Sequence, residues 1–129
     1  MPSSMKGTIK YLGDTCALAG ILRGEKNYQK YTQDIVFTTE HNILELHHLF
    51  IKTNKKEYAL KCMLFWLQYI SPITVKSIEK ASYLKLHRKK DKLSYTDCIG
   101  YELSKILGVK FLTSDSKFKN MDNVEFVEV

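Results

Sequence analysis

The sequence predicts an α/β fold with a central, mostly parallel sheet. Short runs rich in β-branched and aromatic residues alternate along the chain with longer stretches of helical periodicity. The connections between these elements are short, and we find no internal repeat, low-complexity tract or interdomain linker. Such alternation is typical of units in which helices cover the faces of a parallel sheet. Because 129 residues suffice for one hydrophobic core, we expect residues 1–129 to form a single domain.

The first half of the chain contains two predicted strands and four predicted helices. In order, we expect a strand over residues 7–12, a helix over residues 16–22, a polar helix over residues 27–31, a strand over residues 35–38, and helices over residues 42–51 and 55–69. Asp14 is suited to begin the first helix, and Gly24 is suited to end it. The second half of the last helix is apolar almost all round, which indicates either a central position or a surface covered by a second subunit.

The second half of the chain continues the alternation. The expected elements are a short strand over residues 71–74, helices over residues 75–88 and 96–107, a strand over residues 109–113 and a terminal strand over residues 125–129. Ser94 and Asp97 have the spacing of a capping box, which predicts where the second of these helices begins. The glycine at position 108 predicts its end.

Composition excludes several classes of protein. The longest dense apolar run, residues 62–67, is far shorter than the roughly 20 residues of a membrane-spanning helix. Residues 1–14 show no secretory signal, so we expect a cytoplasmic protein with no membrane association. Cys16, Cys62 and Cys98 are odd in number, widely spaced and set among apolar residues, which favours reduced core thiols over a disulfide or zinc framework.

The net charge of +6 favours polyanionic partners, because basic side chains neutralise phosphates and release counterions. The densest basic segment, residues 85–92, closes a predicted helix, where positive charge also suits the helix dipole. The segment is therefore either a solvated helix end or part of a nucleic-acid contact. If RNA binds, the candidate contacts are Lys85, Arg88, Lys89, Lys90, Lys92, Lys117 and Lys119.

Four acidic residues are expected at one edge of the sheet. Asp14 follows the first strand, Glu45 lies early in the helix after the second strand, and Asp115 follows the strand over residues 109–113. Asp97 opens the helix that feeds that strand. In an open parallel sheet the strands end, and the flanking helices begin, at the edge where ligands bind. The four carboxylates are therefore expected to converge.

Helix capping is the alternative explanation for each acid taken singly. Ser94 and Asp97 form one capping pattern, Asn42 and Glu45 form an approximate second one, and Asp14 is a suitable N-cap. Capping explains the set less well, because neutral residues would serve equally. Two carboxylates about 4 Å apart repel by about 4 kcal/mol at an effective dielectric constant near 20. A divalent cation would remove that repulsion.

An all-oxygen set of carboxylates and waters suits Mg²⁺ or Mn²⁺, as one or two ions, and does not suit zinc. His47 and His48 lie beside Glu45, but no further Cys or His stands at ligand spacing. A basic protein with such a site is suited to hydrolyse phosphodiesters with a metal-activated water. Hydroxyl groups that could hydrogen-bond a ligand carboxylate or a metal-bound water belong to Thr15, Thr113 and Ser114.

The chain resembles the PIN-domain family, and within it the small VapC-like toxin ribonucleases. Three stretches carry the resemblance: LGDTCALAG at residues 12–20, TTEHNILEL at residues 38–46, and LSYTDCIGYELSKILGVKFLTSDSKF at residues 93–118. The last stretch is the most specific, because both its Ser-x-x-Asp helix start and its Thr-x-Asp-x-x-Phe strand end look like the family pattern. The resemblance spans nearly the whole chain.

The resemblance implies a three-layer α/β/α sandwich with Mg²⁺- or Mn²⁺-dependent endoribonuclease activity on RNA. The family's acidic positions correspond to the same four residues, and Thr113 matches its hydroxyl position before the last acid. Proteins of this kind are commonly homodimers held inactive by an antitoxin protein. Two departures stand out: the residue after Asp14-Thr15, often Asn or Ser in the family, is Cys16, and Gly13 replaces the usual bulky apolar residue.

Two other functions stay open at this point. A non-catalytic RNA-binding or scaffolding member of the same fold would keep the basic surface and lose metal-dependent turnover. The complete set of four acids argues against it. A processing nuclease for stable RNA, outside any toxin-antitoxin system, would share the chemistry and differ in target.

Overall fold

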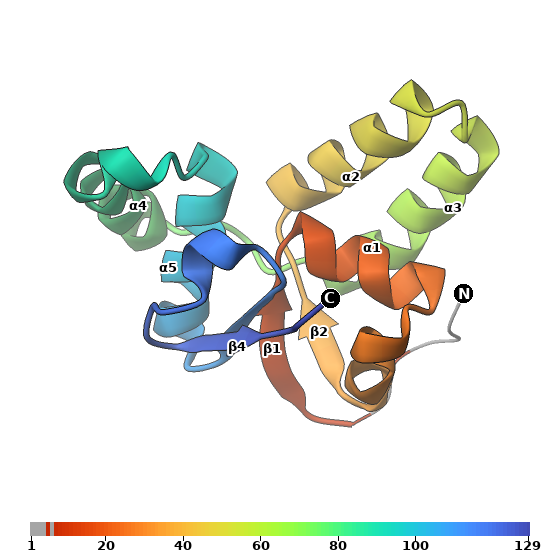
Figure 1. Cartoon of the computed structure of the whole chain (residues 1–129), viewed down its shortest axis with the longest axis horizontal. Coiled ribbons are helices and arrows are strands. Elements are labelled where there is room, and N and C mark those ends of the chain that lie inside the picture. The colour runs from red at the N-terminus through yellow and green to blue at the C-terminus, as the bar shows by residue number, and fades with distance from the viewer. Residues whose placement is uncertain (1–4, 6) are drawn as a thin grey trace.

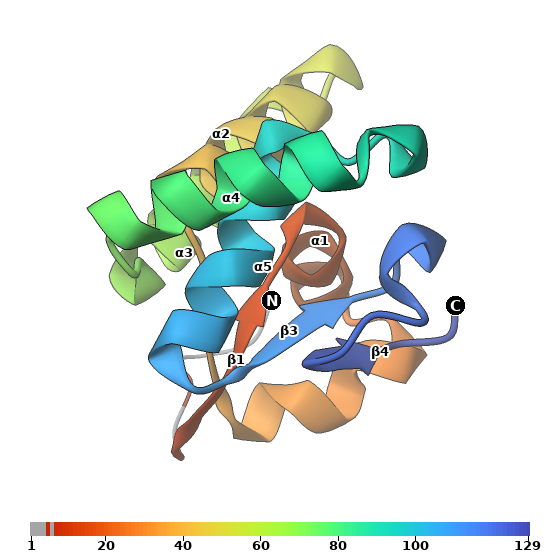
Figure 2. The same cartoon turned by 90° about the vertical axis from the view of Figure 1, so that its left-hand side faces the viewer.

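The computed structural model describes Met5 and residues 7–129. At its centre lies a parallel four-stranded sheet of order β2-β1-β3-β4. Its strands are β1 (Ile9–Gly13), β2 (Ile35–Phe37), β3 (Lys110–Thr113) and β4 (Val124–Phe126). Leu12 pairs with Phe37 on one side and with Phe111 on the other. Figure 2 shows β3 between β1 and β4.

Within the described residues, five α-helices and four 3₁₀ segments surround the sheet. The α-helices are α1 (Thr15–Arg23), α2 (Glu40–Lys52), α3 (Lys56–Trp66), α4 (Val75–His87) and α5 (Tyr95–Leu107). The 3₁₀ segments are η1 (Lys26–Gln33), η2 (Leu67–Tyr69), η3 (Lys89–Asp91) and η4 (Ser116–Phe118). α1 and α5 both end at a glycine in the left-handed conformation, Gly24 and Gly108, as their sequences predict.

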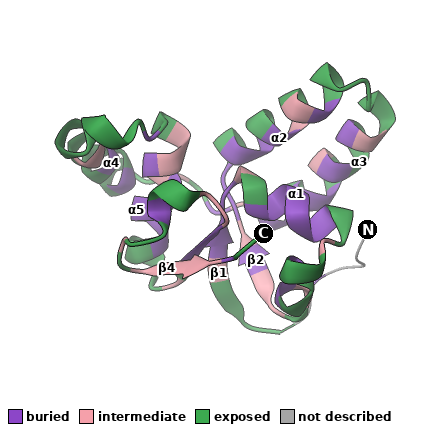
Figure 3. Cartoon of the chain, in the orientation of Figure 1, coloured by how far each residue is buried: buried purple, intermediate pink, exposed green. Residues whose placement is uncertain are grey.

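The helices form a layer on each face of the sheet. One core cluster joins α1, α2 and α3 to the sheet through residues such as Leu18, Phe50 and Leu112. The second joins α5 and α4 to the other face through residues such as Leu12 and Phe111. Figure 1 shows these two groups of helices on opposite sides of β1 and β2, and Figure 3 shows that α1 is largely buried. The predicted three-layer α/β/α sandwich is confirmed.

Several predicted boundaries are wrong. Residues 71–74 form no strand; the preceding Ile70 makes a single parallel bridge to Thr38, and Pro72 has no N–H to donate to a ladder. The helix expected over residues 55–69 is an α-helix, α3, only as far as Trp66, and the 3₁₀ segment η2 follows it. The polar helix expected over residues 27–31 is the 3₁₀ segment η1. The terminal strand is shorter than expected and ends at Phe126.

Within the described residues, no helix is long and apolar enough to cross a membrane. Residues 1–4 and 6, part of the segment in which we looked for a secretory signal, lie outside the described residues. All three cysteines are free. Cys62 and Cys98 are buried as expected, but Cys16 is exposed, because α1 turns this position away from the apolar face that carries Ala17 and Leu18. The expectation of a core thiol is wrong there.

Candidate active site

The carboxyl ends of the strands and the N-termini of the flanking helices meet at one edge of the sheet. Asp14 follows β1 directly and is the N-cap of α1, and Asp115 lies two residues beyond β3. Asp97 lies in the first turn of α5, whereas Glu45 lies in the second turn of α2, because this helix begins at Glu40, before the expected start at residue 42. Figure 1 shows β1 and β2 leading toward the N-termini of α1 and α2. The topology therefore places each predicted acid at this edge.

Asp14 is the buried member of the set, with 3% of its surface exposed. Its Oδ1 accepts a hydrogen bond from the Ala17 backbone N–H at 2.9 Å, and its Oδ2 accepts one from the Thr113 hydroxyl at 2.5 Å. Its own N–H donates to the Leu112 carbonyl at 3.1 Å, which continues the pairing of β1 with β3. Both carboxylate oxygens are thus oriented by the fold.

Burial raises the pKa of Asp14 to about 7, against the lowering effect of its two hydrogen bonds. The charges of Asp97 and Asp115 contribute to this rise in pKa, but less than burial does. Three carboxylates from three separate segments therefore act on one another electrostatically. Such mutual repulsion at a buried position is the condition that a bound cation relieves.

Thr113 connects Asp14 to Asp115. Its buried hydroxyl donates to Asp14 and accepts a hydrogen bond from the Asp115 N–H at 2.9 Å. The Asp115 carboxylate accepts from the Lys117 N–H at 3.0 Å and lies 3.6 Å from the Lys117 ammonium group. Thr113 therefore hydrogen-bonds one of the predicted acids, and its part in supporting a metal ligand stays a prediction.

Asp97 is both a helix cap and a neighbour of Asp14. The Asp97 N–H donates to the Ser94 hydroxyl, and the Ser94 N–H donates to Asp97 Oδ2, both at 3.0 Å. The predicted capping box is therefore confirmed. Capping occupies Oδ2, so Oδ1 can still serve a ligand in the site.

Glu45 is an exposed residue that reaches across to α1. Its Oε1 accepts a hydrogen bond from the Thr15 hydroxyl at 2.7 Å. The predicted capping pattern of Asn42 with Glu45 is wrong, because Thr39 is the N-cap of α2 and accepts from the Asn42 N–H at 3.2 Å. The Glu45 carboxylate is held by its hydrogen bond with Thr15, the residue after Asp14, and takes no part in capping α2.

Cys16 stands among the acids. Its thiol pKa is raised to about 12, first by desolvation and then by the charges of Asp14, Asp115 and Asp97, while a hydrogen bond with Ser114 opposes the rise. The thiol is therefore neutral at physiological pH and a poor nucleophile. Ser114, a predicted hydroxyl neighbour of the site, thus lies beside Cys16.

Asp14, Asp97 and Asp115 are the residues that would hold a metal ion. Among the described residues, no three His, Cys, Asp or Glu side chains are already gathered closely enough to bind one directly. Mg²⁺ is usually held by only one or two carboxylates and retains several waters, so a looser arrangement of oxygen donors suits it. The raised pKa of Asp14 and the oxygen-only donors fit Mg²⁺ or Mn²⁺. His47 instead lines an apolar hollow between α2 and α3, which argues against zinc.

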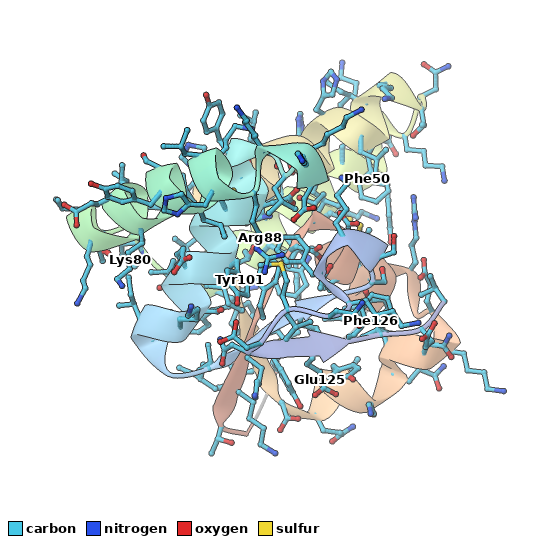
Figure 4. All side chains as sticks on the ribbon, turned by 60° about the vertical axis from the view of Figure 1, so that its left-hand side comes forward. Phe50, Lys80, Arg88, Tyr101, Glu125 and Phe126 are labelled. Carbon is cyan, nitrogen blue, oxygen red and sulfur yellow. The ribbon has the colours of Figure 1, made fainter. Side chains whose placement is uncertain are left out.

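The predicted basic residues lie in two groups. Lys89 and Lys90 are exposed in η3, a few residues before the cap of α5, and Lys92 follows them in the left-handed conformation. The Arg88 guanidinium group lies 3.3 Å from the Asp91 carboxylate. Its positive charge also opposes the rise that burial causes in the pKa of Tyr101, and Figure 4 shows Arg88 and Tyr101 close together.

The second group follows Asp115. Lys117 pairs with that carboxylate at the acidic edge. Lys119 lies 3.1 Å from Glu128 and over the ring of Phe126, which ties it to the C-terminal segment instead. Lys85, in the last turn of α4, belongs to neither group, and its ammonium group donates a hydrogen bond to the Leu93 carbonyl at 2.7 Å.

Two residues near the acids were not predicted. Asn42 is buried and donates to the Thr15 hydroxyl at 3.2 Å, and nothing in its sequence spacing other than the mistaken capping pattern pointed to it. Tyr28, from η1, buries a hydroxyl that has no hydrogen bond among the described residues, although Ser114 lies near enough to affect its pKa. A tyrosine within a polar 3₁₀ segment gives no sequence signal for that position.

Comparisons with known proteins identify the family of this chain. A sequence profile of the PIN domain family matches residues 11–124. The chain belongs to the PIN domain family. No curated protein matches the sequence of this PIN domain.

Solved structures share the fold of this PIN domain. VapC20 of Mycobacterium tuberculosis, described as a sarcin-ricin loop cleaving toxin, superposes with a TM-score of 0.73 at 17% identity, over 93% of this chain and 98% of that one. VapBC2 of Rickettsia felis, bound to promoter DNA, gives a TM-score of 0.71 at 17% identity, over 93% and 99% of the two chains. A toxin-antitoxin complex of Klebsiella pneumoniae gives 0.67 at 14% identity, over 95% and 96%.

Proposed function

We propose that this PIN domain is a Mg²⁺- or Mn²⁺-dependent endoribonuclease that cleaves RNA phosphodiester bonds by hydrolysis. One observation carries the proposal. The buried carboxylate of Asp14, whose pKa is raised to about 7, lies in the field of Asp97 and Asp115 from two other segments. A fold that gathers repelling acids at the ligand-binding edge of its sheet is suited to hold a hard cation against a phosphate.

Each acidic residue has a distinct part in the proposed site. Asp14, Asp97 and Asp115 would hold one or two ions, and Glu45 would complete the acidic edge. When bound, such ions activate a water for attack on phosphorus and offset negative charge on the leaving oxygen.

The protein's own hydrogen bonds would orient these acids. Thr113 keeps Asp14 directed by donating to its Oδ2, and Thr15 fixes the Glu45 carboxylate. Ser114, beside Cys16, would hydrogen-bond a ligand or water at the same edge. Oriented donors of this kind commonly support metal ligands.

We also propose that the protein is the toxin of a toxin-antitoxin pair. Its fold is that of VapC20, described as a toxin that cleaves the sarcin-ricin loop, and of chains in two toxin-antitoxin complexes. The partners would be an RNA substrate, an antitoxin protein and a second copy of the chain, acting as a single domain in the cytoplasm. A processing nuclease outside such a pair would use the same site on another RNA.

The basic residues would supply the electrostatic part of RNA binding. Lys89, Lys90 and Lys92 are exposed close to the start of α5, which carries Asp97. Lys117 lies at Asp115, and the proposal also includes Arg88 and Lys119. A non-catalytic RNA-binding protein would keep these contacts without turnover.

The deciding experiment is cleavage of an end-labelled, mixed RNA pool with Mg²⁺, Mn²⁺ or EDTA, with Asp97→Asn prepared identically. We expect metal-dependent cleavage by the wild-type protein and loss of at least about 100-fold in the variant, since an amide is a poor ligand for a hard cation. Asn can still accept the hydrogen bond from the Ser94 N–H, so the fold should persist. If neither protein cleaves any RNA and both bind it equally, the binding-only function is correct.

A further inference from the structure

We infer that Asn42, buried at the start of α2, is a positioning residue that fixes the Glu45 carboxylate at the acidic edge through the hydroxyl of Thr15. The inference rests on the proposed function in taking Glu45 as part of the active site. In the described part of the chain, the Asn42 side chain hydrogen-bonds Thr39 and Thr15 and none of the four acids. Its effect on the site would therefore pass through Thr15.

Four residues form a continuous chain of hydrogen bonds between α1 and α2. The Thr39 hydroxyl donates to Asn42 Oδ1 at 2.7 Å. Asn42 Nδ2 donates to the Thr15 hydroxyl oxygen at 3.2 Å, and the Thr15 hydroxyl donates to Glu45 Oε1 at 2.7 Å. Thr39 and Asn42 are almost fully buried, whereas Glu45 is exposed. The chain of hydrogen bonds thus runs from the buried interior to an exposed side chain.

The number of protons that each side chain can donate determines which group is the donor in each of these hydrogen bonds. An ionised Glu45 carboxylate only accepts hydrogen bonds, so the single hydroxyl proton of Thr15 must lie between Thr15 and Glu45. The Thr15 oxygen can then only accept from its other neighbour, and Asn42 must present its amide NH₂. Thr39 favours this orientation because its proton is directed at Asn42 Oδ1. Asn42 is therefore the residue that keeps the Thr15 proton directed at Glu45.

An exposed side chain such as that of Glu45 needs a hydrogen-bond donor in a fixed orientation if its carboxylate is to stay in one position. Glu45 is an exposed glutamate on α2, and holding a long, flexible side chain of this kind in one conformation costs conformational entropy. Thr15 is adjacent in sequence to Asp14, so a hydrogen bond to Thr15 holds the Glu45 carboxylate against the segment that carries Asp14. An Asn42→Asp substitution keeps the shape of the side chain but replaces the donor with an acceptor. Thr15 would then donate to position 42 and release Glu45.

The test is a set of double-mutant cycles that needs neither metal nor RNA. Thr15→Val and Glu45→Met are made singly and together, in the wild-type protein and in Asn42→Ala and Asn42→Asp backgrounds. Urea unfolding midpoints are measured in EDTA. We expect the two substitutions to shift the midpoint non-additively in the wild-type protein, because they remove the same hydrogen bond, and additively in the Asn42→Asp background, where the carboxylate at position 42 accepts the Thr15 proton. In the Asn42→Ala background, which removes the donor and adds no rival acceptor, we expect the non-additivity to be smaller than in the wild-type protein.

A merely structural role for Asn42 would lower the midpoint and leave the non-additivity in place. Non-additivity that persists undiminished in the Asn42→Asp background, or is absent from the wild-type protein, would overturn the inference. Asn42→Asp keeps the test decisive if Asn42→Ala fails to fold.

RNA cleavage provides the second readout. We expect Asn42→Asp and Thr15→Val to reduce kcat to a similar extent, and neither to reduce it further in a Glu45→Met background. A wild-type protein that cleaves no RNA would refute the proposed function and leave the unfolding result intact. Further loss of kcat on adding Asn42→Asp to Glu45→Met would overturn the inference alone.

Discussion

Asp14 is buried and lies near two further acids, and both conditions disfavour its charged form when no metal ion is bound. Hydrogen bonds from Ala17 and Thr113 stabilise its charged form, but burial outweighs them and the pKa rises to about 7. At neutral pH the residue is therefore close to its protonation midpoint unless a cation is bound.

The pKa of Asp14 predicts how stability depends on pH in the absence of divalent metal. The folded-state pKa of about 7 lies above the unfolded value of 3.8, so the folded protein binds more protons between these values. Stability should be greatest below pH 4 for this group and decrease as the pH rises toward 7, by on the order of 4 kcal/mol in the free energy of unfolding. Urea unfolding in EDTA at several pH values measures this decrease.

Asp14→Asn is the control for that measurement, because it removes the titrating group and keeps an oxygen that can accept from Ala17. We expect its stability to depend less on pH over the same range. Added Mg²⁺ or Mn²⁺ should stabilise the wild-type protein at pH 7 and have little effect on Asp14→Asn, since the ion binds the ionised folded state. Identical pH profiles for the two proteins would contradict the assignment.

At the scale of single elements, the start of α5 allows the effect of helix capping to be measured apart from the effect of metal binding. Ser94 and Asp97 cap the helix reciprocally, but only Asp97 acts on the charge of Asp14. Ser94→Ala should therefore lower the free energy of unfolding by about 1 kcal/mol, the usual value of such a cap. Metal-dependent RNA cleavage at a temperature where the variant is folded should persist. Thermal unfolding and the cleavage assay measure the two effects, and loss of activity from a fully folded Ser94→Ala would give Ser94 a role in the site.

The 3₁₀ segment η3 tests the electrostatic contribution to RNA binding. Lys89 and Lys90 are exposed and close in sequence to the start of α5. Changing both to Gln should weaken RNA binding and reduce the slope of log K against log salt concentration by about 1–2, because fewer phosphate counterions are released. Fluorescence anisotropy at several salt concentrations measures that slope.

Lys56→Gln with Lys110→Gln is the matched control, because it removes the same charge elsewhere. Lys110 begins β3, at the opposite edge of the sheet from Asp115, and Lys56 begins α3. We expect this pair to leave the slope nearly unchanged. Equal slopes for both double variants would show that RNA does not contact η3.

At the scale of the whole molecule, α2 and α3 leave an apolar surface uncovered. Leu60, Leu64 and Leu67 are spaced along one side of α3 and its continuation, and between 46% and 56% of each is exposed. Leu44 of α2 is 67% exposed and shares a hollow with Leu67. Exposed apolar patches of this kind mark protein interfaces, which supports the proposal of a homodimer.

Leu64→Lys should therefore shift the protein from dimer toward monomer while leaving the fold intact. A charge in the centre of an apolar interface remains unpaired and costs several kcal/mol. Light scattering after size-exclusion chromatography measures the mass, and circular dichroism checks the fold. Ile9→Lys, at a 45% exposed position in β1, is the control and should remain dimeric. A wild-type monomer at micromolar concentration would rule out the homodimer.

The periodicity of the sequence predicted the alternating α/β order, and short-range patterns predicted individual features well. Asp14 before α1, Ser94 with Asp97, and the glycines after α1 and α5 are confirmed because caps depend on residues a few positions apart. Residues 71–74 and the end of the last strand were wrong because pairing in a sheet depends on partners distant in sequence. The edge at which the four acids lie followed from topology alone, since a parallel sheet fixes where strands end.

Only the tertiary structure decided how the acids are held. The Thr113 contact with Asp14 joins residues 99 positions apart, and the Thr15 contact with Glu45 joins residues 30 positions apart. The exposure of Cys16 and the burial of Asn42 likewise depend on how α1 and α2 pack. The sequence by itself determined which residue types could form the site, because types and spacing are local. Their hydrogen bonds and the raised pKa of Asp14 arise from burial and long-range contacts, which exist only in the folded chain.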